Sequence, residues 1–228
     1  MKQLILLRHG QSQWNLENRF TGWTDVELSE KGRAEAAEAG VKIKEAGISP
    51  RFFFTSYLKR AIHTLQIAAD SMNLDWVPVI KDWHLNERHY GALQGLNKAD
   101  TAAKFGDDQV KIWRRSFDVQ PPALEADDDR APVNDSRYAM LPSTALPLTE
   151  SLKDTVARVE ACWQEVIVPK IMLYDTVLIA AHGNSLRALA KILLKISDDD
   201  IINLEIPTGS PWLFELDNRL NVVSERYL

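Results

Sequence analysis

The sequence predicts an α/β fold, a three-layer sandwich in which a mostly parallel central sheet is flanked by helices on both faces. Short apolar runs alternate with helical patterns from the N-terminus onward, which is typical of parallel strands joined by right-handed crossovers. The first run, residues 3–7, is continuously apolar, as expected for a strand buried on both faces. With 228 residues and 45% hydrophobic content, the chain can bury one large core. We therefore expect a single domain over residues 1–228.

The remaining elements are predicted in chain order from caps and periodicity. A helix runs from its N-cap Ser29 to about Ala46, and small residues define its expected buried stripe. That stripe comprises Ala34, Ala37, Val41 and Lys44. Further strands are expected at 52–56, 76–80 and 176–181, with a closing hairpin at 212–216 and 222–226. Further helices are expected at 58–72, 97–105, 107–116, 185–196 and 197–204, and one opens at Ser151 with a capping box and ends near Pro169.

Two stretches show no periodicity. Residues 84–94 are a candidate site loop, because chemistry is often carried by loops on a rigid scaffold. Residues 118–148 are rich in proline and acid, and we expect an irregular surface excursion and a candidate lid. A structureless segment of this length within a compact domain is usually functional or mobile.

Composition excludes several classes of protein. The net charge of −5 and pI of about 5.6 argue against a nucleic-acid partner. The single cysteine, Cys162, allows no intrachain disulfide, and we expect a small core residue in a reducing compartment. Only four apolar residues, Leu4 to Leu7, follow the N-terminus, too few for a signal peptide or a membrane span. We therefore expect a cytoplasmic protein with no membrane partner.

Two predicted strands end in the same way. The first is followed by Arg8, His9 and Gly10, and the strand at 176–181 is followed by His182 and Gly183. In open α/β sheets, ligands bind beyond the carboxyl ends of the strands. If the two strands are neighbours, the two imidazoles meet there. The alternative is two unrelated histidines, each hydrogen-bonded to a backbone carbonyl.

An anion fits this sheet edge better than a metal ion. Imidazole is a common metal ligand, but the sequence has no HExxH, no CxxC and no acidic cluster beside either histidine. The cation of Arg8, next to His9, disfavours a metal and can bind phosphate in a bidentate way. An imidazole facing a phosphoryl group can act as a nucleophile and form phosphohistidine. Neutral donors near this edge are Asn15, Thr21 and the amides around Gly10 and Gly183.

Further charged residues fit a phosphoryl-transfer site, although each also has a simpler interpretation. Arg60 follows the second strand and can reach the same edge, but arginines are usually solvated. Arg114 and Arg115, with Lys98, could hold a second anionic group, or they could form a solvated helix face. Glu87 is the best candidate for a general acid or base, although loop carboxylates are usually just solvated.

The motifs resemble the histidine phosphatase superfamily and, more narrowly, its cofactor-dependent (2,3-bisphosphoglycerate-requiring) phosphoglycerate mutases. The superfamily signature is matched by Leu-Arg-His-Gly-Gln-Ser-Gln-Trp-Asn at 7–15. The narrower resemblance rests on Glu-Arg-His-Tyr-Gly at 87–91 and Trp-Arg-Arg-Ser at 113–116. Other matching segments are 20–23, 55–61, 85–86, 150–154, 181–187 and 207–209, together with Lys98.

This resemblance implies a phosphoglycerate-mutase-like domain and a set of roles. His9 would be the phosphorylated nucleophile, Glu87 the proton donor and acceptor, and His182 a stabiliser of the transferring group. Arg8 and Arg60 would complete the catalytic set. The implied substrate-binding residues are Arg8, Ser12, Asn15, Thr21, Gly22, Arg60, Glu87, Tyr90, Lys98, Arg114, Arg115, Gly183 and Asn184.

The implied reaction interconverts 3-phosphoglycerate and 2-phosphoglycerate in glycolysis and gluconeogenesis. Phospho-His9, primed by the cofactor 2,3-bisphosphoglycerate, would donate to the substrate and recover the other phosphoryl group, with no metal. The alternatives are a phosphatase of the same superfamily, including a bisphosphoglycerate phosphatase, and a non-catalytic phosphate-binding module. Family members are often dimers or tetramers, so a homodimer or homotetramer is implied.

The end of the chain departs from the family pattern. Family members commonly carry a mobile, charged C-terminal tail that helps to close the site, whereas this chain stops at Leu228, just after its last expected strand. Site closure keeps water from a reactive intermediate. We therefore expect faster loss of phosphate from His9 to water than in a tailed relative, with the 118–148 segment as a possible partial cover.

Overall fold

The computed structural model describes residues 1–228 and contains one six-stranded sheet with the order β3-β2-β4-β1-β5-β6. Strands β1 to β4 run parallel, whereas β5 is antiparallel to β1 and forms an antiparallel hairpin with β6. This confirms the predicted α/β class with a mostly parallel sheet. The strands are β1 Lys2–Arg8, β2 Phe52–Thr55, β3 Val79–Lys81, β4 Thr176–Ala181, β5 Pro211–Leu216 and β6 Val222–Tyr227.

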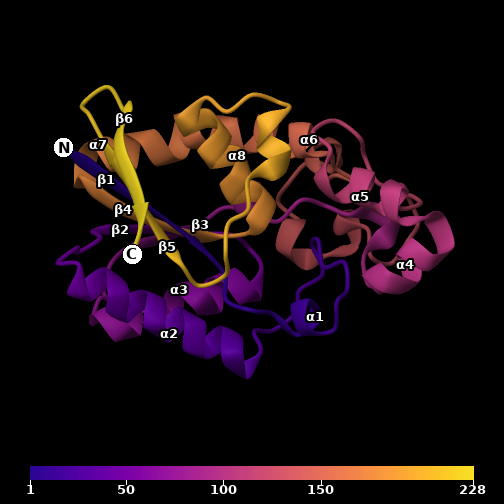
Figure 1. Ribbon diagram of the computed structural model, residues 1–228, viewed down its shortest axis with the longest axis horizontal. Helices are drawn as coiled ribbons and strands as arrows, with labels where there is room; N and C mark the ends of the chain where they lie inside the picture. The colour runs from indigo at the N-terminus through magenta and orange to yellow at the C-terminus, as the bar shows by residue number, and fades with distance from the viewer.

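Helices cover both faces of the sheet, as Figure 1 shows. Helices α2 and α3 pack on one face, and α6, α7 and α8 pack on the other, each against its own apolar cluster. Helices α4 and α5 lie apart from these layers, near the carboxyl ends of the strands (Figure 1). The helices are α1 Gln13–Leu16, α2 Glu30–Glu45, α3 Lys59–Met72, α4 Lys98–Phe105, α5 Asp107–Arg115, α6 Leu152–Cys162, α7 Val168–Tyr174 and α8 Gly183–Leu194.

Strand β1 lies in the middle of the core. Its residues Leu4 and Leu6 face the α6–α8 layer, while Ile5 and Leu7 face the α2–α3 layer. All four side chains are fully buried. The continuous apolar run therefore has the predicted cause: a strand covered on both faces needs apolar residues at every position.

The buried stripe of α2 differs from the predicted one. The helix buries Ala36, Ala39 and Ile43, whereas Val41 is exposed. A Cβ added to Gly40 would lie only 2.4 Å from the carbonyl oxygen of Ala68 in α3. The close approach of α2 and α3 at Gly40 therefore determines which face of α2 is buried.

Three further elements differ from the prediction, and one of them, the helix expected at 197–204, is only a 3-10 turn at Asp200–Asn203. The third strand starts at Val79 rather than Trp76, whose side chain is exposed before the strand begins. The helix from Ser151 does not end at Pro169, because a π-helical turn over Trp163–Ile167 connects α6 to α7. This turn leaves Pro169 in the first turn of α7, where a missing N–H costs little.

The 118–148 segment is irregular, as predicted, with only isolated 3-10 turns. It does not cover the site, because none of its residues lines the main cavity described below. It packs behind the 84–94 loop instead: the Tyr138 hydroxyl accepts from Asn86, and the Arg130 guanidinium donates to the carbonyl of Gln94. Its role in the fold is therefore that of a support, and the expectation of a lid is wrong.

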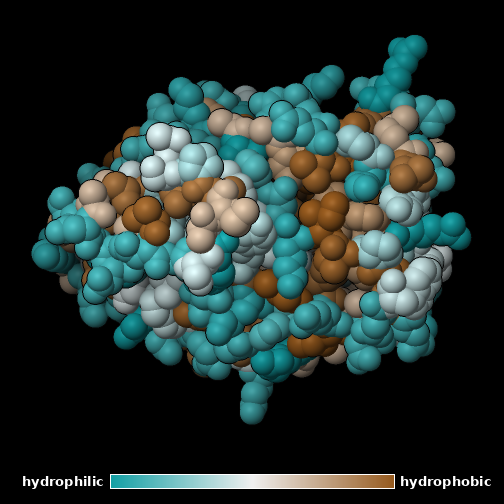
Figure 2. All heavy atoms as spheres, turned by 180° about the vertical axis from the view of Figure 1, so that it is seen from behind, coloured by the Kyte–Doolittle hydropathy of each residue, from teal (hydrophilic) through white to brown (hydrophobic).

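None of the helices is both long enough and apolar enough to span a bilayer. Figure 2, which shows the molecule from behind, has a mostly hydrophilic surface with hydrophobic atoms gathered in limited areas. Cys162 is buried and unpaired, as predicted, and its burial raises the pKa of the thiol, so the residue serves as packing.

At the β1–β4 pair, the helices that follow the strands change from one face of the sheet to the other. The helix that follows β1 in the core, α2, packs on one face of the sheet, and the helix that follows β4, α8, packs on the other. The loops leaving the two neighbouring strands therefore diverge and leave space between them, which is where ligands bind in open α/β sheets.

Candidate active site

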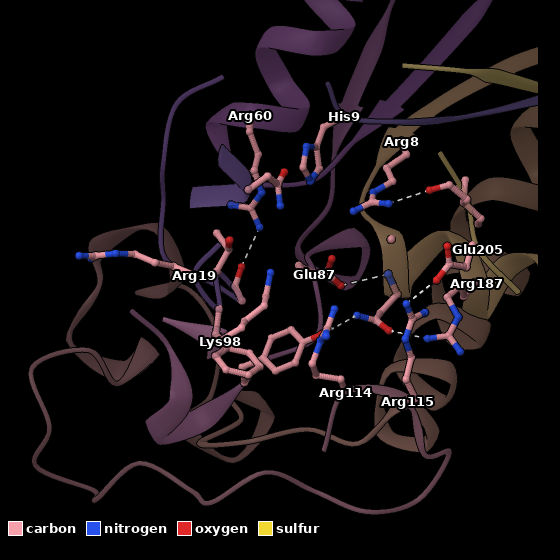
Figure 3. A pocket seen from close by; sticks show the side chains of 18 of the residues that line it. Arg8, His9, Arg19, Arg60, Glu87, Lys98, Arg114, Arg115, Arg187 and Glu205 are labelled. Carbon is pink, nitrogen blue, oxygen red and sulfur yellow. Dashed lines mark hydrogen bonds and ion pairs between the residues drawn. The ribbon is translucent and has the colours of Figure 1, made fainter. Parts of the chain in front are cut away.

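The main cavity opens beyond the carboxyl ends of β1 and β4 and has a volume of about 390 Å³. Seven of its 20 lining residues are arginine or lysine and two are glutamate, although the whole chain carries a net charge of −5. Figure 3 shows His9, Arg8 and Arg60 on one side of the cavity, Arg114 and Arg115 on the other, and Glu87 between them. The local charge is suited to a ligand with more than one anionic group.

The two histidines meet, as predicted. Arg8 pairs with Ala181 in the parallel β1–β4 register, so the next residue of each strand lies at the same edge. The ring centroids of His9 and His182 are 5.0 Å apart, and the rings are inclined by 60°. The interpretation of two unrelated histidines is therefore wrong for this structure.

One nitrogen of His9 is free to attack. Its Nδ1 lies 2.7 Å from the carbonyl oxygen of Gly10, and a carbonyl can only accept, so Nδ1 carries the proton. Nε2 then holds the lone pair of a neutral imidazole. Burial, together with the nearby cations of Arg60 and Arg8, lowers the pKa of His9 well below its usual value. The ring therefore stays neutral, with an unprotonated and nucleophilic Nε2, at neutral pH.

His182 lies against His9 but does not line the cavity, because its side chain is fully buried. Its Nε2 lies 2.7 Å from the hydroxyl of Ser56, while Nδ1 is buried without a partner. Burial and the Arg60 cation lower the pKa of His182 as well.

Glu87 presents one carboxylate oxygen to the cavity. Its Oε1 accepts from the backbone N–H groups of Arg88 at 2.8 Å and Asn184 at 3.1 Å, and Oε2 makes no hydrogen bond. The side chain is 8% exposed, unlike the solvated loop carboxylates that provide its simpler interpretation. A Cβ on Gly183 would lie 3.6 Å from Oε2, which places this oxygen beside the turn after β4.

The guanidinium groups of Arg8 and Arg60 are held by carbonyls rather than carboxylates. Arg60, 1% exposed, donates to the carbonyls of Thr24 and Gly22, and Arg8 donates to that of Ile206 at 2.7 Å. Each Nε is buried and unpartnered. Burial lowers the pKa of Arg60 to about 10, which leaves it charged at neutral pH. The positive charge of both arginines thus remains available to an anion.

Asn15 lines the cavity, whereas Ser12, predicted to bind substrate, does not. Ser12 is the N-cap of α1, and its hydroxyl accepts from the Asn15 backbone N–H. The Asn15 side-chain oxygen accepts in return from the Ser12 N–H at 3.0 Å. The serine therefore orients Asn15 so that its amide N–H₂ is available, and the prediction for Ser12 itself is corrected to this supporting position.

The remaining predicted residues all line the cavity: Thr21, Gly22, Tyr90, Lys98, Arg114, Arg115, Gly183 and Asn184. Of these, Lys98, Arg114 and Arg115 form the far wall, across from His9 (Figure 3). Burial, reinforced by the Arg114 cation, lowers the pKa of Lys98. Arg115 forms an ion pair with Glu205 at the rim, whereas Arg114 has no acidic partner. Lys98 and Arg114 therefore carry positive charges that no carboxylate neutralises, and this favours an anionic ligand.

Gly10 and Gly22 are required for packing, not for an approach to ligand as predicted for Gly10. A Cβ on Gly10 would lie 2.1 Å from the carbonyl oxygen of Gly32 at the start of α2. Gly22 has a φ of +53°, and a Cβ there would meet the side chain of Gln94 at 2.0 Å. By contrast, a Cβ on Gly183 would make only ordinary contacts, the nearest at 3.5 Å from Arg8 Nε.

Several lining residues were missed by the sequence analysis. Arg187 sits one turn into α8, and its Nη1 donates to the Asn184 side-chain oxygen at 3.0 Å, which turns the Asn184 N–H₂ group toward the Tyr90 hydroxyl. Helical spacing from Asn184 is the signal that could have found it. Arg19 points away from the cavity centre in Figure 3. Phe20 and Pro207 lie in the matching segments 20–23 and 207–209 but were not assigned to the site, and the rim segment 204–206 carried no signal.

A family model decides the affiliation of the chain. The model of the histidine phosphatase superfamily (branch 1) matches residues 4–226. The chain belongs to this superfamily. The match confirms the resemblance of the sequence motifs to the superfamily. It does not decide the narrower resemblance to phosphoglycerate mutases.

Solved structures of this superfamily fold are similar over the whole chain. A mycobacterial glucosyl-3-phosphoglycerate phosphatase has a TM-score of 0.75 at 24% identity, covering 100% of this chain and 97% of its own. The alpha-ribazole phosphatase of Shigella flexneri has a TM-score of 0.71 at 20% identity, covering 99% and 95%. Bacillus stearothermophilus YhfR has a TM-score of 0.73 at 23% identity, covering 97% and 94%. At these identities the likeness establishes the fold, here the phosphoglycerate-mutase-like fold.

Proposed function

We propose that the protein is a 2,3-bisphosphoglycerate-dependent phosphoglycerate mutase that works through phospho-His9. The observation that carries this proposal is the second group of cations, Lys98, Arg114 and Arg115, on the cavity wall across from His9. Each phosphoglycerate has two anionic groups on different carbons, a phosphate and a carboxylate. A site that isomerises it must hold both ends, whereas hydrolysis of a simple phosphate ester needs only one.

The first half-reaction transfers a phosphoryl group between His9 and a bound hydroxyl. With phospho-His9 as donor, the substrate hydroxyl oxygen forms the new P–O bond, the Nε2–P bond breaks, and Glu87 Oε2 takes the hydroxyl proton. In the reverse direction Nε2 attacks phosphorus, the P–O bond breaks, and Glu87 returns the proton to the leaving oxygen. One carboxylate can serve both directions because the two steps are mirror images.

The charge of the transferring group is met by side chains already in place. Phosphoryl transfer spreads negative charge over the equatorial oxygens, and preorganised donors stabilise it without reorganisation. Arg8 and Arg60 supply positive charge, and the Asn15 and Asn184 amides supply neutral donors. His182, whose ring lies against that of His9, would support His9 as it carries the transferring group. The 2,3-bisphosphoglycerate intermediate would then reorient, using the far-wall cations for whichever end is not reacting.

A phosphatase is the second candidate function. It is favoured by the structurally similar proteins from mycobacteria and Shigella flexneri, whose names describe phosphatases. His9, Glu87 and the two nearby arginines would act in the same way, with water in place of the acceptor hydroxyl. Because both functions would use these residues in the same way, they do not discriminate between the two. The cations of the far wall, Lys98, Arg114 and Arg115, are the residues that do.

The deciding experiment measures conversion of 3-phosphoglycerate to 2-phosphoglycerate with and without added 2,3-bisphosphoglycerate. We expect conversion that depends on the cofactor, and a phosphoryl group detected by intact mass on the wild type but not on His9→Ala. Release of inorganic phosphate from phosphate esters without isomerisation would select the phosphatase. A wild type that binds phosphoglycerates but never becomes phosphorylated would leave only a binding module.

A further inference from the structure

One buried arginine outside the cavity has every donor engaged around Glu87. Arg158, on α6, has a side chain that is only 8% exposed. Its Nε and Nη2 donate to the two carboxylate oxygens of Glu150 at 2.7 and 3.0 Å. The remaining N–H groups donate to the carbonyls of His84, Asn86 at 3.0 Å and Glu87 at 3.0 Å. A guanidinium has five N–H donors, so none is left over.

These bonds fix the backbone that carries Glu87 from the side opposite the cavity. The Glu87 carbonyl also accepts from the indole N–H of Trp23 at 2.5 Å, and Glu150 accepts from the backbone N–H of His89 at 2.8 Å. The loop is not part of any helix or strand at Glu87, so its conformation depends on such side-chain bonds. With the backbone held behind, the side chain can only extend forward to the cavity.

We propose that Arg158, paired with Glu150, is a positioning residue that aims Glu87 Oε2 at the oxygen that gains or loses the proton. The proposal rests on the acid–base role that the proposed function gives Glu87. Arg158 does not line the cavity and touches no substrate. Displacements of about 1 Å at a reacting group can cost about a hundredfold in rate, so a support of this kind is a determinant of catalysis.

The geometry explains why the residue is arginine. A lysine keeps the charge and the partnership with Glu150, but its three donors radiate from one atom and cannot serve three carbonyls and a carboxylate at once. The substitution Arg158→Lys should therefore loosen the Glu87 backbone while the buried carboxylate of Glu150 keeps a counter-ion. A loss of activity in this variant would then reflect the position of Glu87 and not the cost of an unpaired buried charge.

Leaving-group dependence tests the proposal. When Nε2 of His9 attacks 2,3-bisphosphoglycerate, the P–O bond breaks to an alkoxide that must take a proton from Glu87. When it attacks p-nitrophenyl phosphate, p-nitrophenolate leaves as a weak base and needs no proton. General acid catalysis contributes roughly 10²–10⁴-fold where a proton is needed. A structural defect in the phosphate site would slow both donors alike.

The experiment measures the rate of His9 phosphorylation by each donor in wild type, Glu87→Gln, Arg158→Lys and the control Arg137→Lys, which alters another multiply bonded arginine, paired with Asp25 and Asp135. We expect Arg158→Lys to slow the 2,3-bisphosphoglycerate reaction about 10- to 100-fold and the p-nitrophenyl phosphate reaction less than about threefold, the pattern of Glu87→Gln in milder form. The control should leave both rates within about twofold of the wild type.

Each other outcome has its own meaning. Equal slowing of both donors, or slowing of neither, in Arg158→Lys would overturn the positioning role while Glu87→Gln still shows the selective loss. If Glu87→Gln itself shows no selectivity, the acid–base role in the proposed function fails first. Should thermal melts show that Arg158→Lys does not fold, Glu150→Gln provides the second variant, and unchanged donor selectivity there would refute the proposal.

Discussion

The substitution Arg114→Met tests whether the far wall of the cavity reads the second anionic group of the substrate. Arg114 ends α5, lines the cavity and has no acidic partner in the protein, so its charge is available to substrate. A hydrogen bond to a charged group contributes about 1.5–3 kcal/mol. At 1.4 kcal/mol per tenfold change, we expect kcat/KM for 3-phosphoglycerate isomerisation to fall roughly 10- to 150-fold. Hydrolysis of p-nitrophenyl phosphate, which has a single anionic group, should change less than about threefold.

The matched control is Lys111→Met, which removes the same charge from the same helix at an exposed position outside the main cavity. It separates a direct contact from a general change in electrostatic potential, and both reactions should stay within about twofold of the wild type, because such long-range effects are screened by salt. Equal losses for both substrates in Arg114→Met would refute the reasoning, as would an unchanged kcat/KM for 3-phosphoglycerate. Steady-state kinetics at fixed ionic strength gives all four values.

Three further outcomes follow from burial. Folding stability should fall below pH 6.5 by up to about 1.4 kcal/mol per pH unit for each histidine that the fold keeps neutral, because the unfolded chain then takes up protons that the folded chain does not. Urea unfolding from pH 7.5 to 5 checks this, and a flat profile would contradict it. Burial lowers the pKa of three histidines: those of His9 and His182 fall well below the usual value, and that of His89 falls to about 3. Gly10→Ala should destabilise the fold by roughly 1–3 kcal/mol through overpacking, whereas Gly183→Ala should not, as denaturant midpoints would show. Native Cys162 should resist alkylation until the protein unfolds, and fast labelling in buffer would show that the thiol is accessible.

The features that the sequence predicted correctly depend on short stretches of chain. The run Leu4–Leu7 and the strand at 176–181 are apolar because neighbours cover both faces, so composition alone reveals them. Both histidines follow such strands at once, and parallel neighbours bring their ends together. The capping boxes at Ser12 and Ser151 also depend only on residues close together in the sequence, although only the second was predicted.

The features that were missed depend on what packs from elsewhere. The buried stripe of α2 follows from the approach of α3 at Gly40, a contact between helices that the periodicity of one helix does not contain. Gly10 accommodates α2, a contact that motif spacing does not contain. The lid expected at 118–148 proved to be a support behind the site loop, because an irregular segment carries no signal of the side on which it lies.

The arginines of the cavity show why its charge could not be read from the overall composition. Arg8, Arg60 and Arg187 are bonded to backbone carbonyls or an amide oxygen, and none forms an ion pair. A carboxylate partner would neutralise the guanidinium, whereas a carbonyl satisfies its donors and leaves the net charge in place. The carbonyls come from loop and rim segments, whose side chains carry no information about the bond. A chain with a net charge of −5 thereby maintains a strongly positive cavity. Arg158, by contrast, has a carboxylate partner in Glu150 and lies outside the cavity.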